Sequence, residues 1–176
     1  MKQEWILKKI ILLLLMLGIA LESCVLFAQA AETGDYSNEV GVQQLGVSYN
    51  WTEEKYGGAL SSASKEIKPA SGQISVNVSS HRVSSYTYTA GNLELIFTNN
   101  YESDAYLSFD WTITNGYGSF TIAGDGPNGS KTGSVNKKLA SRQSVKVTIT
   151  SNNKPNSASQ GAGMDITNIK LVEDVK

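Results

Sequence analysis

The chain has few of the side chains that enzymes use, and those it has are poorly placed for catalysis. His81 is the single histidine of the 176 residues, so a Ser-His-Asp triad could be built only around it. The sequence contains no GxSxG motif that would hold a nucleophilic serine. Glycoside hydrolysis needs two carboxylates facing one sugar, but Glu53 and Glu54 are adjacent and would point to opposite faces of a strand. We therefore predict that the protein is not an enzyme.

Candidate metal ligands are also sparse. The stretch DGPNG at residues 125–129 has the Asp, Asn and Gly content of a calcium loop, but it lacks the spaced acidic residues and the distal Glu of an EF-hand. Such a stretch is typical of a turn. The single cysteine, Cys24, lies near the N-terminus. The rest of the chain therefore has no cysteine for thiol catalysis, for a disulfide or for a metal site.

Aromatic residues are the strongest candidates for ligand contacts. Tyr49, Trp51 and Tyr56 lie in the polar stretch YNWTEEKYGG, beside amide and carboxylate groups that suit a hydroxyl-rich ligand. A flat exposed ring could stack on the apolar face of a sugar. However, Val47, Tyr49 and Trp51 alternate, so Trp51 could equally close one end of a hydrophobic core. The sequence leaves these two interpretations open.

A second aromatic stretch, YLSFDWTITNG at residues 106–116, can be interpreted from its alternation. Trp111 has the same parity as Leu107, so the pattern predicts that both are buried. Tyr106 and Asp110 have the opposite parity and should lie on the open face of the same strand. They are the candidates for ligand binding on that face.

The N-terminal residues have the features of a secretory signal peptide. A basic start is followed by the apolar run IILLLLMLGIAL and by small residues at Ala28 and Ala30, which predicts cleavage after residue 30. The run is short for a membrane span, so we predict no transmembrane segment in the mature chain. The sequence LESC suggests a lipoprotein carrying lipid on Cys24, but Glu22 and the apolar residues after the cysteine fit that motif less well. We predict secretion, with retention at the cell surface as the alternative.

Most of the chain from residue 72 onward predicts β-structure. Short segments alternate apolar and polar residues, which is typical of half-buried strands in an antiparallel sheet. The segments are 74–79, 86–89, 92–97, 105–113, 119–122 and 145–150. Turn signals separate them, and Asn115-Gly116 predicts a tight type I′ hairpin.

Two other parts of the chain are less regular. In MDITNIKL, the apolar pair Met164 and Ile166 and the apolar pair Ile169 and Leu171 have opposite parity, which predicts a β-bulge near Thr167. Residues 31–70 contain an entry strand or two, and residues 59–68 suggest a short helix that stops before a proline. Together the patterns predict an all-β fold, in which residues 31–176 form one two-sheet antiparallel β-sandwich, jelly-roll-like.

Residues 91–172 resemble β-sandwich modules of secreted and surface proteins of Gram-positive bacteria, including jelly-roll carbohydrate-binding modules. The stretches YLSFDWTI, LASRQSVKVTITS and MDITNIKL carry this resemblance. It implies sugar binding by aromatics on a concave sheet face or in loops at one edge. It also implies a structural calcium near the termini, for which Asp165 is the candidate ligand; we predict no other cofactor.

These observations favour a secreted, non-catalytic binding module with a glycan as its ligand. The alternative is a structural or adhesive surface protein that contacts another extracellular protein. The net charge of −1 and the absence of a basic stripe argue against nucleic acid as a partner. The predicted ligand-binding residues are Tyr49, Trp51, Tyr56, Tyr106 and Asp110.

Overall fold

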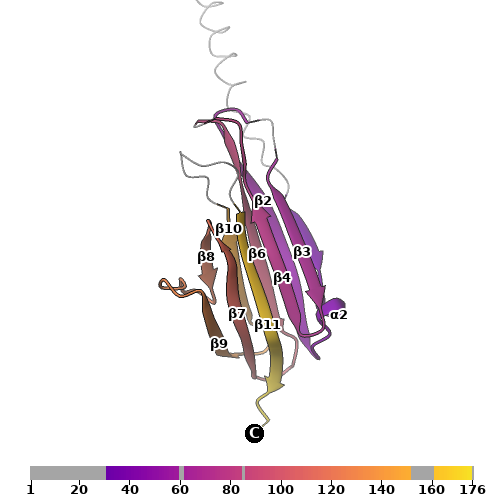
Figure 1. Cartoon of the computed structure of the whole chain (residues 1–176). Helices are drawn as coiled ribbons and strands as arrows, with labels where there is room; N and C mark the ends of the chain where they lie inside the picture. The colour runs from indigo at the N-terminus through magenta and orange to yellow at the C-terminus, as the bar shows by residue number, and fades with distance from the viewer. Residues whose placement is uncertain (1–30, 60–61, 85, 152–160, 176) are drawn as a thin grey trace, which may run out of the picture.

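The computed structural model describes residues 31–59, 62–84, 86–151 and 161–175. These residues form two antiparallel β-sheets packed face to face, as predicted (Figure 1). The signal peptide predicted for residues 1–30, with Cys24, lies outside the described residues. No helix among the residues described is long and apolar enough to cross a membrane.

The first sheet has the strand order β1-β2-β6-β10-β8, and β5 pairs additionally with β6. Its strands are β1 (Glu32–Asp35), β2 (Leu45–Tyr56), β5 (His81–Arg82), β6 (Tyr88–Asn99), β8 (Ser119–Ile122) and β10 (Ser144–Thr150). A one-turn helix, α2 (Ser37–Val40), connects β1 to β2.

The second sheet has the strand order β3-β4-β11-β7-β9. Its strands are β3 (Ser64–Ala70), β4 (Gln73–Ser79), β7 (Ala105–Gly116), β9 (Thr132–Leu139) and β11 (Gly161–Glu173). From β7 to β11, each strand lies in the opposite sheet from the strand before it. This alternation gives the sandwich its jelly-roll-like character.

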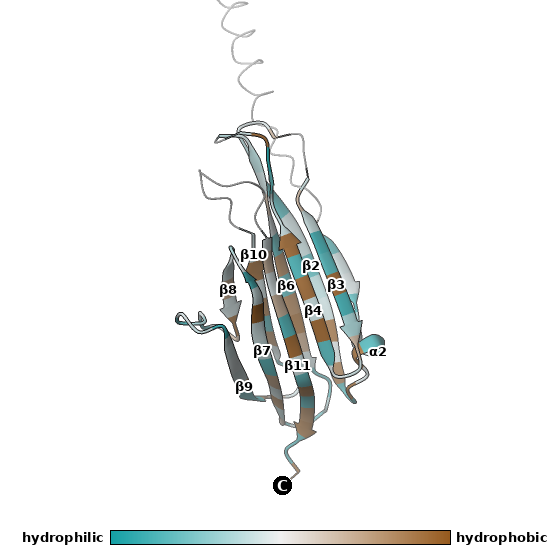
Figure 2. Ribbon diagram, viewed as in Figure 1, coloured by the Kyte–Doolittle hydropathy of each residue, from teal (hydrophilic) through white to brown (hydrophobic). Residues whose placement is uncertain are grey.

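The interior is built from the apolar positions of the alternating segments, and Figure 2 shows this alternation along β4, β7 and β11. Phe97 of β6 and Phe109 of β7 face each other across the two sheets, with ring centroids 5.4 Å apart. Leu107 is fully buried, and Trp111 is only 8% exposed. The burial predicted from the parity of the 106–116 stretch is therefore confirmed.

The predicted β-bulge is present in β11. The pairing of β11 with β7 shifts register between Thr167 and Lys170, so that two residues of β11 oppose one residue of β7. Because of this extra residue, Ile166 and Ile169 both reach the core, with exposures of 0% and 3%. The residue left over, Asn168, has a φ of 54° and its side chain lies on the outer face.

Two local predictions are wrong. Of the helix suggested for residues 59–68, the described residues form none, because residues 64–70 pair with β4 as the edge strand β3. Pro69 fits there, since a proline on an edge strand removes no hydrogen bond that the sheet interior needs. Asn115 and Gly116 do not form a hairpin turn either. They continue β7 opposite β11, and the chain then crosses to β8 in the other sheet.

Candidate functional site

Tyr49 and Trp51 are part of the core and do not form an exposed platform. Each is 7% exposed, and both point inward from β2. The indole of Trp51 lies over Gly91, where an added Cβ would come within 2.1 Å of the ring. The Tyr49 hydroxyl donates a hydrogen bond to Glu32 at 3.0 Å. Burial first, and then this carboxylate, raises the pKa of Tyr49 to about 12. The interpretation of Trp51 as a closing residue of the core is therefore the one the structure supports.

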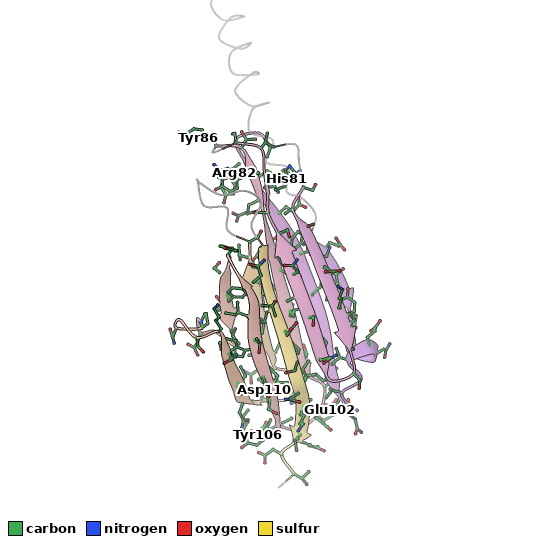
Figure 3. All side chains as sticks on the ribbon, in the orientation of Figure 1. His81, Arg82, Tyr86, Glu102, Tyr106 and Asp110 are labelled. Carbon is green, nitrogen blue, oxygen red and sulfur yellow. The ribbon has the colours of Figure 1, made fainter. Side chains whose placement is uncertain are left out.

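Tyr56 is exposed but lies apart from the other candidates. Its side chain is 40% exposed and stacks on Tyr88, with ring centroids 4.4 Å apart. Its hydroxyl donates a hydrogen bond to Glu54, which together with burial raises the pKa of Tyr56 to about 12. Tyr88 is paired with Arg82, and Figure 3 places Arg82 at the end of the molecule opposite Tyr106. Tyr56 therefore cannot share a site with Tyr106.

Tyr106 and Asp110 lie together on the outer face of the second sheet (Figure 3). Tyr106 is 43% exposed. Beside it, a depression of about 410 Å³ covers the strands β9, β7 and β11. The residues that line it carry hydroxyl, amide, carboxylate and ammonium groups on the outer face, and Phe109 and Val135 contribute from strand positions whose side chains point inward. The lining residues are Ser108, Phe109, Asp110, Ser134, Val135, Asn136, Asn168 and Lys170. We call Tyr106 and this depression the outer-face site.

Asp110 is the fixed centre of the outer-face site. One carboxylate oxygen accepts a hydrogen bond from the Ser134 hydroxyl at 2.5 Å, and the other accepts one from the Asn168 amide at 2.8 Å. These two hydrogen bonds, with the nearby charge of Lys170, hold the pKa of Asp110 below its ordinary value. The β-bulge places the Asn168 side chain on the outer face, beside Asp110. The bulge requires a positive φ at this residue, and asparagine adopts one more readily than most residues. The site thus holds an ionised carboxylate whose orientation is set by two neighbouring strands.

We expect the Ser134→Ala substitution to raise the pKa of Asp110 toward the ordinary aspartate value, because it removes the hydrogen bond that lowers the pKa most. In the wild type, the stabilisation from ionised Asp110 is present above the unfolded-state pKa and is lost as the pH falls through the lowered folded-state pKa. In the Ser134→Ala variant, the stabilisation from ionised Asp110 should be lost at a higher pH, because the folded-state pKa of Asp110 is higher there. An NMR titration of the Asp110 carboxyl carbon measures this difference. Ser108→Ala is the control, and an unchanged titration in Ser134→Ala would refute the assignment.

Tyr106 lies beside a cluster of charges at the end of the sheet. The ammonium of Lys138 lies 5.8 Å from the centre of the Tyr106 ring. It also pairs with Asp174 at 2.7 Å and with Asp104 at 3.0 Å, and these carboxylates raise the pKa of Lys138. Val172, directly opposite Tyr106 on β11, is 60% exposed. The ring therefore lies on an open and partly apolar surface, with an ammonium beside it.

Asp165, the predicted calcium ligand, lies in the middle of β11. Its cross-strand neighbours are Ser75 of β4 and Thr112 of β7, which carry hydroxyl groups. In the part of the chain that the structure describes, no three His, Cys, Asp or Glu side chains gather in a way that could hold a metal ion. The calcium prediction therefore gains no support from carboxylates around Asp165.

Four polar residues of the outer-face site did not stand out in the sequence: Ser134, Asn136, Asn168 and Lys170. Ser134 is 24 positions from Asp110 and Asn168 is 58 positions away, so only the strand pairing brings them together. A partial signal was available for Asn168, because the parity switch in MDITNIKL places the bulge there. Ser134 and Asn136 occupy polar positions of an ordinary strand and have no distinguishing pattern.

No protein-family model and no curated protein matches the sequence. Among solved structures, the carbohydrate-binding module TmCBM61, determined in complex with β-1,4-galactotriose, is similar to this chain. The two are 12% identical, and the match covers 70% of this chain and 88% of that chain with a TM-score of 0.29. At this level of similarity the comparison carries no argument about the ligand of this protein.

Proposed function

We propose that the protein binds a glycan without catalysing a reaction, and that it does so through the outer-face site. The observation that carries this proposal is the combination of a half-exposed ring, Tyr106, with a carboxylate, Asp110, that Ser134 and Asn168 hold in place. Recognition of a hydroxyl-rich ligand needs both an apolar surface and fixed polar groups with little freedom to lose. These two residues provide both on one strand.

The remaining groups of the outer-face site suit the same kind of ligand. Ser108 and Asn136 can each donate and accept hydrogen bonds, and Lys170 donates only. Tyr106 and Asp110 are four residues apart on β7, which corresponds to about 13 Å at about 3.3 Å per residue. A ligand that contacts both must be longer than one sugar ring. The site is therefore suited to an oligosaccharide rather than to a monosaccharide.

The chemistry of Asp110 favours binding over hydrolysis. A glycosidase needs a second carboxyl group facing the sugar and a general acid with a raised pKa. Asp110 is the one carboxylate among the residues that line the depression, and its pKa is lowered. A carboxylate that stays ionised accepts hydrogen bonds from sugar hydroxyls but does not protonate a leaving group.

The proposal is tested by screening the purified protein against an array of neutral and acidic polysaccharides. Asp110→Ala is expected to weaken binding about 10- to 100-fold, because a hydrogen bond to a charged group contributes about 1.5–3 kcal/mol. Tyr106→Ala should weaken binding as well, through loss of ring contact. Isothermal titration with the best polysaccharide measures both effects.

Matched controls separate the site from general effects of the substitutions. Glu39→Ala removes an exposed carboxylate from α2, and Tyr117→Ala removes a ring that is 64% exposed beyond the other end of β7. Both should bind like the wild type. Absence of binding to every polysaccharide of the array, or full affinity in Asp110→Ala, would refute the proposal. Absence of binding would also favour the alternative, in which the protein contacts another extracellular protein.

A further inference from the structure

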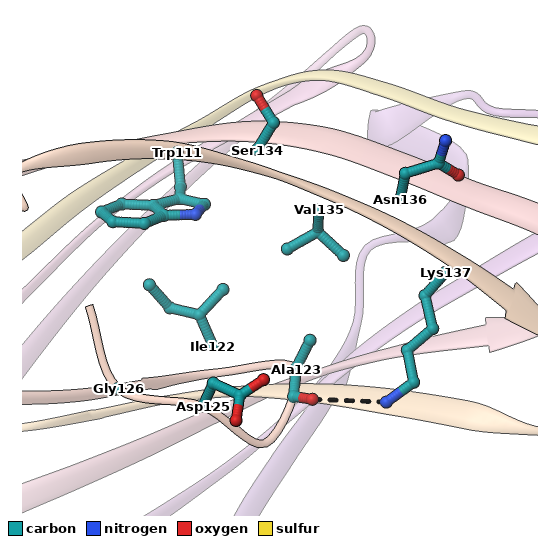
Figure 4. A pocket seen from close by; sticks show the side chains of 9 residues that line it. All are labelled: Trp111, Ile122, Ala123, Asp125, Gly126, Ser134, Val135, Asn136 and Lys137. Atoms are coloured by element: carbon teal, nitrogen blue, oxygen red, sulfur yellow. Dashed lines mark hydrogen bonds between the residues drawn. The ribbon is translucent and has the colours of Figure 1, made fainter. Parts of the chain in front are cut away.

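A second cavity opens at the edge of the sandwich, where the outermost strands of the two sheets, β8 and β9, come together (Figure 4). Its volume is about 400 Å³, which is within the range of small-molecule sites of about 300–1,000 Å³. Apolar side chains and a rim of polar groups line it. They are Trp111, Ile122, Ala123, Asp125, Gly126, Ser134, Val135, Asn136 and Lys137. We call this cavity the edge cleft.

The indole N–H of Trp111 is the polar group on the inner side of the edge cleft. Trp111 is 8% exposed, and its nitrogen-bearing edge lies against Gly133, where an added Cβ would come within 2.9 Å of the nitrogen. In Figure 4 the nitrogen side of the ring faces the cavity. No residue in the described part of the chain accepts a hydrogen bond from it. Because buried tryptophan N–H groups normally have a partner, this donor is available to a ligand in the cleft.

The rim of the edge cleft carries two opposite charges and a strained backbone. Lys137 lies opposite the buried Leu107 on the inward side of β9, and its ammonium donates a hydrogen bond across the cleft to the carbonyl of Ala123 at 3.3 Å. Ala123 has a φ of 54°, in the left-handed region that alanine seldom adopts. Asp125 follows on the same turn, which is closed by hydrogen bonds between Ile122 and Asp125. Donor and acceptor groups thus face each other around an apolar floor.

The edge cleft adjoins the outer-face site on the other side of β9. Ser134, Val135 and Asn136 of β9 line both cavities. Ser134 and Asn136 point to the outer face and Val135 points inward, because side chains alternate along a strand. Only the edge strand β9 separates the two cavities, and a strand occupies about 4.8 Å across a sheet.

We propose that the edge cleft is a second subsite for the same glycan, so that the ligand is an oligosaccharide chain that passes across β9. This inference rests on the proposed function. One sugar unit occupies the edge cleft, with its apolar face on Ile122 and Val135 and its hydroxyls on Trp111, Asp125 and Lys137. The following units lie over Ser134 and Asn136 and reach Asp110 on the outer face.

The test is the dependence of affinity on chain length. The probe is a size-fractionated series, from a single sugar unit to a hexasaccharide, prepared from the polysaccharide that binds most tightly in the array. We expect affinity to rise in two steps, as first one subsite and then both are filled. Lys137→Ala and Asp125→Asn should each lower the affinity for the long chains about tenfold, which is equivalent to about 1.4 kcal/mol. The affinity of both variants for the short chains should be the same as that of the wild type. Lys55→Ala, at the far end of β2, is the matched control.

A direct readout comes from the tryptophan itself. The indole N–H resonance of Trp111, assigned through a Trp111→Phe variant, should shift when the hexasaccharide binds. If affinity reaches a plateau at short lengths and both rim variants bind hexasaccharide normally, while Asp110→Ala still binds weakly, the edge cleft is not a subsite and the proposed function stands. If no sugar of any length binds, both proposals fail.

Discussion

Replacement of Asn99 with alanine is expected to lower the free energy of unfolding by about 3–5 kcal/mol, although Asn99 lies away from both cavities. Asn99 is fully buried at the end of β6. Its amide nitrogen donates to the carbonyls of Ser103, Leu139 and Ala140 at 2.9, 3.2 and 3.0 Å, and its carbonyl oxygen accepts from the Tyr101 N–H at 2.9 Å. Alanine would remove this partner from four backbone groups, although the carbonyl of Ala140 keeps a hydrogen bond from the Gln143 N–H. A buried group that is left unsatisfied costs about 1–3 kcal/mol.

Guanidinium denaturation of the wild type and of Asn99→Ala measures this effect. The matched control is Asn38→Ala on α2, where the side chain is exposed and the expected change is below about 0.5 kcal/mol. A loss below about 1 kcal/mol in Asn99→Ala would mean that water replaces the side chain, and that these hydrogen bonds do not tie the turn after β6 to the turn after β9.

Phe97→Ala is expected to destabilise the fold by a similar amount, about 3–5 kcal/mol, through a different cause. Phe97 is 0% exposed and stacks on Phe109 of the opposite sheet, so alanine leaves a cavity between the two sheets. Phe97→Leu retains most of the volume and should cost less than half as much. Chemical denaturation of both variants separates the loss of volume from the loss of the ring contact.

A double-mutant cycle with Phe109→Leu gives the coupling between the two rings. We expect a coupling of about 0.5–1.5 kcal/mol, the range for aromatic pairs in contact. Additive effects of the two substitutions would show that the sheets are held by general burial rather than by this pair. Thr98→Ala, next to Phe97 but pointing to the outer face, controls for changes in strand propensity.

The sequence was informative at most places where the structure depends on local alternation, although Tyr86 and Thr87 of the predicted segment 86–89 lie before β6 and Tyr86 is exposed. Parity alone predicted the buried Trp111, the open positions of Tyr106 and Asp110, and the bulge that brings Ile166 and Ile169 into one core. Each of these follows from the period of two that a strand imposes on its side chains.

Local patterns failed where pairing between distant segments decides the outcome. Residues 59–68 suggested a short helix, but the pairing of residues 64–70 with β4 makes that segment an edge strand. Asn115-Gly116 is a hairpin signal, but the chain crosses to the other sheet after it. The partners of Asp110 depend on the neighbours of β7, and the roles of Tyr49 and Trp51 depend on what covers β2. None of these is encoded within a short window of sequence.

The position of Lys137 also bears on how the protein behaves at high concentration. In the part of the chain that is described, β9 is an edge strand of the second sheet, and such edges can recruit strands from other molecules. Another sheet that stacked over the edge cleft would have to strip water from the Lys137 ammonium, at a cost of several kcal/mol for a buried ion. A flexible sugar chain can leave that ammonium in contact with water or hydroxyl groups, whereas a sheet stacked over it would bury the charge. The same lysine that would contact a sugar thus disfavours the stacking of a second sheet over the edge cleft.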